Sequence, residues 1–486
     1  MKKSRHGDMY APRNQLSSRF GTKTSSRRES PKSEGCSPRA TFEYTPSKIK
    51  ARIKPNKNVA PPVASSTGNV RLNSSRANHT ASRKLAAIQT SSHIHQLLYI
   101  YNIHSRTPCQ PDRGRKCGMK VAVIGAGILG ASVAYRLAEG GARVTLVERG
   151  EPGGGASAAS FAWVNANEKK PRAYFGLNYA GLREHYRLRE EFGGAPWLHP
   201  GGNLVWSADA RGLRERVERL RGWGYAAETV GEERARELEP EVRSPGVAAA
   251  YFPEEAWVDV PRLVRELVER ARAAGAEVRT GSPVVGIEAE VSAVRLAGGE
   301  RVAVDAVVNA AGPDADRVAG MAGSPLPLAP RRGLLVRLEV RGAPLRRVLH
   351  APEVNLRPDG AGYLIAHHES VDRRLGGKDE RRLAVELLER ARGILPVPEA
   401  RVSGVRVGTR PVPADGYPSV GAAPGIPGYY EAVTHSGVTL GPLLGRLLAC
   451  EILGGEVHPL AAPYRPGRLR EQRMTEHPIR NAKEGG

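Results

Sequence analysis

The chain has 486 residues and a formal net charge of +23, with 40% hydrophobic and 25% charged residues. This length predicts two or three domains, or one large two-domain enzyme with an appendage. We find no apolar run near the roughly 20 residues of a membrane-spanning helix, and no secretory signal. Four cysteines are too few for a disulfide scaffold and suit a reducing compartment, so we expect a cytoplasmic protein without a transmembrane segment.

Residues 1–118 form a basic segment with 23 Lys and Arg against 5 Asp and Glu, rich in Ser, Thr, Asn and Pro. Such a composition cannot bury enough apolar surface to offset the conformational entropy of ordering, so we expect this extension to be disordered. Three interpretations stay open. The segment is an inert or misassigned extension upstream of Met119, a targeting segment, or an arm that binds nucleic acid or an acidic membrane.

A dinucleotide-binding pattern follows. An apolar strand at 121–124 leads into Gly125, Gly127 and Gly130 in G-x-G-x-x-G spacing, then an apolar-faced helix and a second strand that ends at Glu148. The first glycine permits the turn, the second lets the backbone approach a pyrophosphate, and the third lets the helix pack on the strand. An acid 18 residues beyond Gly130 can accept ribose hydroxyls and disfavours a phosphorylated ribose. The pattern predicts FAD or NAD.

The downstream elements favour FAD. No second G-x-G-x-x-G follows, and the loop at 150–167 is built of small residues where a flavin-binding chain passes close to the cofactor. An amphipathic helix with Leu263, Val264, Leu267 and Ala271 on its apolar face, a strand around Val284 and an apolar strand ending at 310–312 come next. Near the C-terminus, a strand at 429–433 runs into a His-Ser-Gly turn and a long apolar helix, which aims a second helix N-terminus at the cleft.

Three blocks in this order, VIGAGILG...E, VVNAAGP and GTRPVPADGYPSVG...THSGVTLGP, resemble the D-amino-acid oxidase family of flavin-dependent oxidoreductases, which includes glycine oxidase, sarcosine oxidase and D-amino-acid dehydrogenase. The resemblance runs from Met119 to about residue 470. It implies an α/β fold, with a Rossmann-like FAD-binding domain and a second substrate domain built on a mixed or antiparallel sheet. It also implies an enzyme that uses FAD.

The resemblance implies an extended FAD, with its adenine near Glu148 and its flavin ring between the small-residue loop and the second helix N-terminus. No Cys stands where sarcosine oxidases tether flavin and no His replaces it, so we expect FAD to be bound non-covalently. The expected cofactor-binding residues are Gly125, Gly127, Gly130, Glu148, Ser157, Ala158, Ser160, Val284, Ala311, Gly312, Gly437, Val438 and Thr439.

Arg410 and His368 are the expected catalytic residues. Arg410 precedes Pro411, which restricts it to an extended backbone, and matches the family arginine that clamps a substrate carboxylate. His367 and His368 lie in an apparent strand, whose neighbours point to opposite faces, so at most one of them can face the flavin. The sarcosine-oxidising branch has a histidine near His368 and a lysine near Leu364, and the missing lysine weakens the case for fast reaction with dioxygen.

Four further residues have an open assignment. His435 is a candidate for flavin contact, and Trp163, Asn165 and Asn167 either line the cleft or pack in the core. We find no spacing typical of a metal site. The electron acceptor, whether dioxygen, a quinone or a carrier protein, also stays open.

We expect an FAD-binding domain assembled from 119–172, 255–330 and 403–472, a substrate domain from 173–254 and 331–402, and a tail at 473–486. The expected reaction is hydride transfer from the α-carbon of an amine or amino acid to flavin, which gives an imine that hydrolyses. Two alternatives remain: a same-fold flavoenzyme for another donor such as a 2-hydroxy acid, or a flavoprotein acting on tRNA wobble-base amines with the basic arm as its RNA contact.

Overall fold

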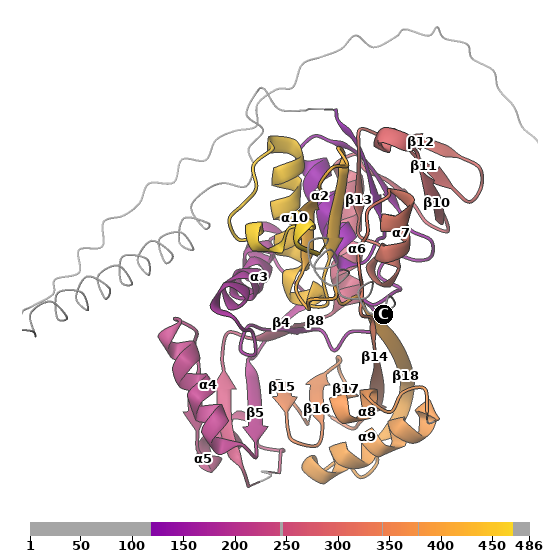
Figure 1. Cartoon of the computed structure of the whole chain (residues 1–486). Coiled ribbons are helices and arrows are strands. Elements are labelled where there is room, and N and C mark those ends of the chain that lie inside the picture. The colour runs from indigo at the N-terminus through magenta and orange to yellow at the C-terminus, as the bar shows by residue number, and fades with distance from the viewer. Residues whose placement is uncertain (1–117, 244–245, 343, 378, 470–486) are drawn as a thin grey trace, which may run out of the picture. The chain divides into compact units, whose positions relative to one another are not determined.

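The computed structural model describes residues 118–469, with gaps at 244–245, 343 and 378. The segment expected to be disordered, residues 1–118, lies outside the described residues except for Gly118, and so does the tail at 473–486. The described part contains two large sheets, one mainly parallel and one mainly antiparallel, together with the helices that pack on them (Figure 1).

The parallel sheet holds six strands in the order β19-β20-β13-β1-β2-β9. β1 pairs in parallel with β2 and β13, and β19 runs antiparallel at one edge. Val121 and Val123 in β1 pack in one apolar cluster and Ala122 in another, so both faces are covered, which explains the uninterrupted apolar sequence. The strands are β1 (Lys120–Ile124), β2 (Arg143–Val147), β9 (Glu277–Arg279), β13 (Ala306–Asn309), β19 (Ser419–Ala422) and β20 (Tyr429–Val433).

The helices of this half form a packed layer. α2 packs against both α6 and α10, and α3 packs against α10. Small residues permit the close approach of α10 to α2, since a Cβ at Gly445 would lie 2.5 Å from the Ser132 Cβ. The helices are α2 (Ile128–Glu139), α3 (Arg172–Glu191), α6 (Val260–Ala273), α7 (Ala315–Met321) and α10 (Gly437–Gly454).

By length and composition α10 qualifies as a membrane span, with a mean hydropathy of 1.3 over 18 residues, yet 78% of this window is buried inside the protein. Arg446 and Glu451 interrupt the apolar sequence of α10, so no apolar run of this length was expected. Its apolar residues pack against α2 and α3.

Cys450 in α10 is disulfide-bonded, which does not support the interpretation of the cysteine content as that of a reducing compartment. A cytoplasmic location stays a prediction.

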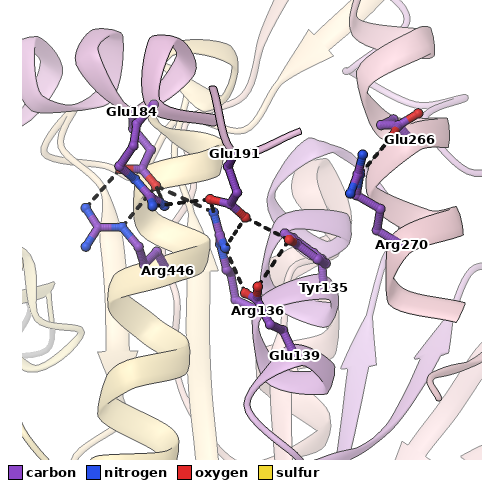
Figure 2. Close-up of polar contacts among 9 residues, drawn as sticks. Tyr135, Arg136, Glu139, Glu184, Glu191, Glu266, Arg270 and Arg446 are labelled. Atoms are coloured by element: carbon purple, nitrogen blue, oxygen red, sulfur yellow. Dashed lines mark hydrogen bonds and ion pairs between the residues drawn. The ribbon is translucent and has the colours of Figure 1, made fainter. Parts of the chain in front are cut away.

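A buried network of ion pairs joins α2, α3 and α10 (Figure 2). Glu184 on α3 accepts two hydrogen bonds of 2.9 Å from Arg446 on α10, and Arg187 donates to the same carboxylate. Arg136 on α2 donates two hydrogen bonds, of 2.6 and 2.8 Å, to Glu191 at the end of α3. Burial by itself would raise the pKa of Glu184, but Arg446 and Arg187 outweigh it and hold the pKa below its ordinary value.

The antiparallel sheet holds eight strands in the order β18-β14-β17-β16-β15-β5-β7-β6. β18 (Arg401–Arg410) pairs with β14 (Arg331–Glu339) along its whole length, and a parallel pair, β15 with β5, joins the two halves of the sheet. α9 packs on β14, β17 and β18. The other elements are β5 (Asn203–Ser207), β6 (Glu228–Val230), β7 (Ala248–Phe252), β15 (Val348–His350), β16 (Asn355–Pro358), β17 (Tyr363–His367), α4 (Ala210–Gly222), α5 (Glu232–Leu238), α8 (Glu369–Asp372) and α9 (Glu380–Ile394).

Two smaller sheets complete the described part. One has the order β3-β8-β4 and fixes the end of the loop at 150–167 to β8; the other has the order β10-β11-β12. Their strands are β3 (Trp163–Val164), β4 (Leu198–Pro200), β8 (Ala256–Val258), β10 (Val284–Ile287), β11 (Ala293–Leu296) and β12 (Arg301–Ala303).

The structure differs from the predicted domain segments at two places. Residues 403–410 belong to the antiparallel sheet, because β18 continues its pairing with β14 to Arg410. Helix α3 was expected in the substrate domain, but its buried face packs on α10. The remaining boundaries stay a prediction.

We expect Glu184→Ala to lower the free energy of unfolding by about 3–5 kcal/mol, because the change leaves buried guanidinium groups without a counter-ion. Exposed ion pairs contribute about 0–1 kcal/mol. Arg211→Ala, which removes an exposed pair with Glu215 on α4, is therefore the control. Urea denaturation near neutral pH measures both variants, and equal losses would contradict the role of Glu184.

Candidate active site

A cavity of about 650 Å³ lies where the carboxyl ends of the parallel strands meet the antiparallel sheet. One side is lined by the N-terminal ends of α2 and α10, the loop at 156–163 and the chain just after β13 and β20. Residues of β5, β15, β16, β17 and β18 line the other side. Ligands of open α/β sheets bind outside the carboxyl ends of the strands, so this cavity is where the fold predicts a ligand.

The three glycines of the fingerprint have distinct surroundings. Gly125 has a φ of +99°, and a Cβ there would lie 2.5 Å from the Ala310 carbonyl oxygen. A Cβ at Gly130 would lie 1.8 Å from the Gly125 carbonyl oxygen, so no side chain fits at either position. Gly127 lines the cavity itself, and a Cβ added there would lie 3.1 Å from the Ser157 Oγ. The N-terminus of α2, whose N–H groups can bind a phosphate, therefore borders the cavity.

Seven of the thirteen expected cofactor-binding residues line the cavity: Gly127, Ser157, Ser160, Gly312, Gly437, Val438 and Thr439. The other six, Gly125, Gly130, Glu148, Ala158, Val284 and Ala311, do not. The Glu148 carboxylate instead accepts hydrogen bonds from two backbone N–H groups, those of Ala126 at 2.8 Å and Gly150 at 2.9 Å, and so fixes the glycine turn. A cofactor role for each of the thirteen stays a prediction.

The first turn of α10 is held firmly at the cavity wall. Ser436, just before the helix, shares a hydrogen bond of 3.0 Å with the Tyr174 hydroxyl on α3. The Thr439 hydroxyl lies 3.4 Å from the Trp163 carbonyl oxygen, to which it donates, and accepts from the Asn165 N–H at 3.3 Å. A second helix N-terminus thus faces the cavity, where its dipole favours negative charge.

Arg410 ends β18 and lines the cavity. Its Nη2 donates to the Asp372 Oδ2 at 3.0 Å and lies 3.0 Å from the His367 Nε2. Asp372 also accepts from the Leu334 N–H at 2.8 Å. Burial alone would raise the pKa of Asp372, but hydrogen bonds from His367 and Leu334 and the charge of Arg410 hold it below its ordinary value. Asp372 is therefore an ionised anchor for Arg410.

The two adjacent histidines belong to different elements. β17 ends at His367, and His368 caps α8, where its Nδ1 accepts a hydrogen bond from the Ser370 N–H at 3.2 Å. The expectation that both lie in one strand is wrong for His368, which follows the last residue of β17, and both histidines line the cavity. Burial and the charge of Arg390 lower the pKa of His368. Its catalytic role stays a prediction.

The other candidates divide between cavity and core. His435, Trp163 and Asn165 line the cavity, whereas Asn167 is fully buried. His435 is exposed to solvent at the cavity, and the surrounding protein, together with the charge of Lys169, lowers its pKa to about 4. Flavin contact by His435 stays a prediction.

Behind the wall lies a carboxylate that the sequence analysis did not single out. Glu255 has no solvent-exposed surface and accepts hydrogen bonds from the Tyr225 hydroxyl at 2.7 Å, the Trp163 Nε1 at 2.8 Å, the Asn167 Nδ2 at 2.9 Å and the Asn203 Nδ2 at 3.1 Å. Burial raises the pKa of Glu255 to about 7, although these donors oppose the shift. The carboxylate connects β3, β5 and the chain before β6.

Two more cavity residues were missed, His350 and Lys169. The His350 Nδ1 lies 2.9 Å from the Asn203 Oδ1, and its ring lies 4.1 Å from that of Trp163. Burial, helped by His367, lowers the pKa of His350 to about 3. Neither residue stands in a recognisable motif, and the partners of His350 are distant in sequence, so no local signal marked them.

The family model described as FAD dependent oxidoreductase, DAO, matches residues 120–451. The chain belongs to this family. It is 27% identical to a glycine oxidase of Bacillus licheniformis over 345 residues, which are 69% of this chain and 93% of that protein. It is 29% identical over 422 residues to the tRNA 5-methylaminomethyl-2-thiouridine biosynthesis bifunctional protein MnmC of Ralstonia nicotianae, covering 75% of this chain and 61% of MnmC. The crystal structure of a glycine oxidase from Geobacillus kaustophilus covers 71% of this chain and 98% of its own, with a TM-score of 0.64 at 25% identity.

The protein is thus an FAD-dependent oxidoreductase with the α/β fold that the resemblance implied. Its residues fit the cofactor. A glycine turn without room for a Cβ and two helix N-termini border one cavity, as a pyrophosphate and a flavin that becomes anionic on reduction require. Non-covalent attachment stays a prediction.

We expect Gly130→Ala to weaken FAD binding by about tenfold or more, a loss of roughly 1.4 kcal/mol, because the added Cβ displaces the turn at Gly125. Gly320→Ala, on an exposed face of α7 with open space around the added atom, is the control. Titration of the apoprotein with FAD, followed by flavin fluorescence, measures both. Unchanged affinity in Gly130→Ala would show that the turn does not hold the cofactor.

A second prediction concerns pH. The folded protein raises the pKa of Glu255 to about 7, so it stabilises the protonated carboxyl, and the free energy of unfolding falls as the pH rises from the ordinary carboxyl value through about 7. Glu255→Gln removes this pH dependence, even if the substitution also changes the free energy of unfolding by an amount that is the same at every pH. We expect its stability relative to the wild type to increase by roughly 1–3 kcal/mol between about pH 5 and pH 8.

Urea denaturation across this range tests the point. Glu151→Gln, at an exposed carboxylate, is the control and keeps the wild-type pH profile. Parallel profiles for Glu255→Gln and the wild type would show that Glu255 does not titrate there.

Proposed function

We propose that the protein oxidises the C–N bond of an amine or amino acid of the glycine, sarcosine or D-amino-acid type, giving an imine that hydrolyses. The observation that carries this proposal is Arg410, anchored by Asp372 in the same cavity that the two helix N-termini border. The glycine oxidases among the relatives support the substrate class.

Arg410 is well placed to bind a carboxylate. Among the described residues, the hydrogen-bond partners of its side chain are Asp372 and His367, and both engage Nη2. Nη1 and Nε have no partner among these residues and can donate to a ligand, and a parallel pair of donors forms when Nη2 contributes a second N–H beside either of them. Two parallel N–H donors of a guanidinium match the two oxygens of a carboxylate and fix its orientation as well as its position.

The reaction needs orientation more than strong acid or base groups. When bound, FAD takes up the hydride that leaves the substrate carbon. The substrate ammonium first loses a proton, and His350 and His435 are neutral at neutral pH because burial lowers their pKa values to about 3 and about 4. Neutral rings in the wall accept hydrogen bonds from the amine without repelling it. Arg410 holds the carboxylate and thereby directs the C–H bond.

We expect anaerobic mixing with a suitable amino acid to bleach the flavin spectrum. Glycine, sarcosine and a set of D-amino acids form the first panel. Readmission of air then distinguishes an oxidase from a dehydrogenase that needs a quinone or a carrier protein. Release of ammonia or methylamine excludes a 2-hydroxy-acid donor, and a flavin that no amine bleaches would contradict the proposal.

Arg410→Ala should raise the KM for an amino acid at least about tenfold more than the KM for a simple amine, because only the former uses the carboxylate clamp. Arg410→Lys should recover part of the loss, since an ammonium supplies charge without the fork. Arg401→Ala, at an exposed ion pair on the same strand, is the control. Equal effects on amine and amino acid would contradict a carboxylate clamp.

The likeness to MnmC favours a second candidate, a flavoprotein that acts on tRNA wobble-base amines. The basic residues 1–118, which would contact the RNA, lie outside the described residues. This function requires salt-sensitive tRNA binding by the full chain that is lost when residues 1–118 are deleted. Filter binding of tRNA to the full chain and to the chain without residues 1–118, each at two salt concentrations, tests this second candidate.

A further inference from the structure

Lys169 is the feature of the cavity that the proposed function leaves unused. It lies at the end of the loop that follows β3 and lines the same cavity as Arg410. Its side chain makes no hydrogen bond or ion pair with any of the residues that the structure describes between 118 and 469. Lys169 is half-buried, and an ammonium that is partly removed from water without a counter-ion is costly, so an anionic ligand would stabilise it here.

Neither carboxylate near Lys169 acts as its partner. Glu168 forms an ion pair of 3.1 Å with Arg216 on α4. Glu255 is already surrounded by four neutral donors and is shifted toward its protonated form. Burial lowers the pKa of Lys169, and these two acids oppose the shift only in part. A ligand carboxylate beside Lys169 would remove the penalty and restore its charge.

The segment that carries Lys169 is fixed rather than loose. The Lys169 N–H donates to the Ala166 carbonyl oxygen at 3.1 Å, and the neighbouring Asn167 and Trp163 side chains are held by Glu255. A fixed backbone at Lys169 means that only the side chain has to be ordered when a ligand binds. The geometry is therefore that of a prepared binding residue.

Lys169 and Arg410 act on one part of the cavity. Both are near enough to His435 that, after burial, their charges help to lower its pKa. Asp372 already compensates part of the charge of Arg410, whereas Lys169 has no counterpart among the described residues. If Arg410 binds the first carboxylate of an amino acid, a second cation in the same space calls for a second acidic group.

We propose that Lys169 binds a second carboxylate of the substrate, so that the preferred amine is a dicarboxylic one. The proposal rests on the proposed function, in which Arg410 binds the first carboxylate. The other anions expected in this cavity belong to the cofactor, namely the pyrophosphate and the reduced flavin of FAD, and the experiment separates a substrate carboxylate from the cofactor.

The test compares two substrates that differ by one carboxylate, sarcosine and iminodiacetate, with the FAD-loaded full chain. For the wild type we expect a higher kcat/KM with iminodiacetate. Lys169→Met should lower the iminodiacetate-to-sarcosine ratio at least about tenfold, and Lys169→Arg should restore part of it. Lys170→Met, which removes an exposed charge one residue away, should leave the ratio unchanged.

Equal losses with both substrates, or a lower flavin reduction potential in Lys169→Met with an unchanged ratio, would overturn the proposal and assign Lys169 to the cofactor. A binding measurement keeps the test independent of turnover. Malonate and acetate are titrated against the oxidised flavin spectrum, and Lys169→Met should lose the preference for malonate. If no amine is oxidised, the proposed function fails, while the malonate titration still decides whether Lys169 binds a second carboxylate.

Discussion

The cavity wall depends on one buried carboxylate, that of Glu255. Because it has no exposed surface, its charge can be tolerated only with several donors around it, and these come from three separate parts of the chain. Trp163 and Asn167 belong to the loop after the nucleotide fingerprint, Asn203 to the antiparallel sheet, and Tyr225 to the chain before β6. The same Asn203 holds His350 at the cavity. The hydrogen bonds that the buried Glu255 carboxylate requires thus hold the loop with Trp163 and Asn167 against β5 of the antiparallel sheet.

Around this wall the cavity is arranged for anions. The N-termini of α2 and α10 offer N–H groups and positive dipole ends along one side. Arg410 adds a full positive charge to the same cavity and Lys169 a second cationic group whose pKa burial lowers, while burial keeps His350 and His435 neutral. Positive groups would therefore be available to the pyrophosphate and flavin of FAD and to the carboxylate of the proposed substrate. Such fixed charges lower the energy of a reaction without the reorganisation that water would need.

The positions that the sequence could indicate are those whose constraint is local. Gly125 and Gly130 are required by a turn that closes within six residues, and no side chain fits at either one. Arg410 was found because it stands beside Pro411 in a recognisable block. His368 was misplaced because the end of a strand is decided by hydrogen-bond partners on β14 and β16, and not by the apolar pattern of its own segment. For the same reason residues 403–410 were expected in the other domain, although β14 binds them in register.

The sequence by itself determined that the chain binds FAD on an α/β fold, because glycine spacing, strand polarity and the family blocks are properties of short segments. Only the tertiary structure decided that Glu255, His350 and Lys169 belong to the site. Their burial and charge depend in large part on neighbours far away in the chain, such as Tyr225 beside Glu255 and Asn203 beside His350. These side chains lose water and counter-ions only when the two sheets enclose the cavity, so a local sequence pattern cannot predict the effect.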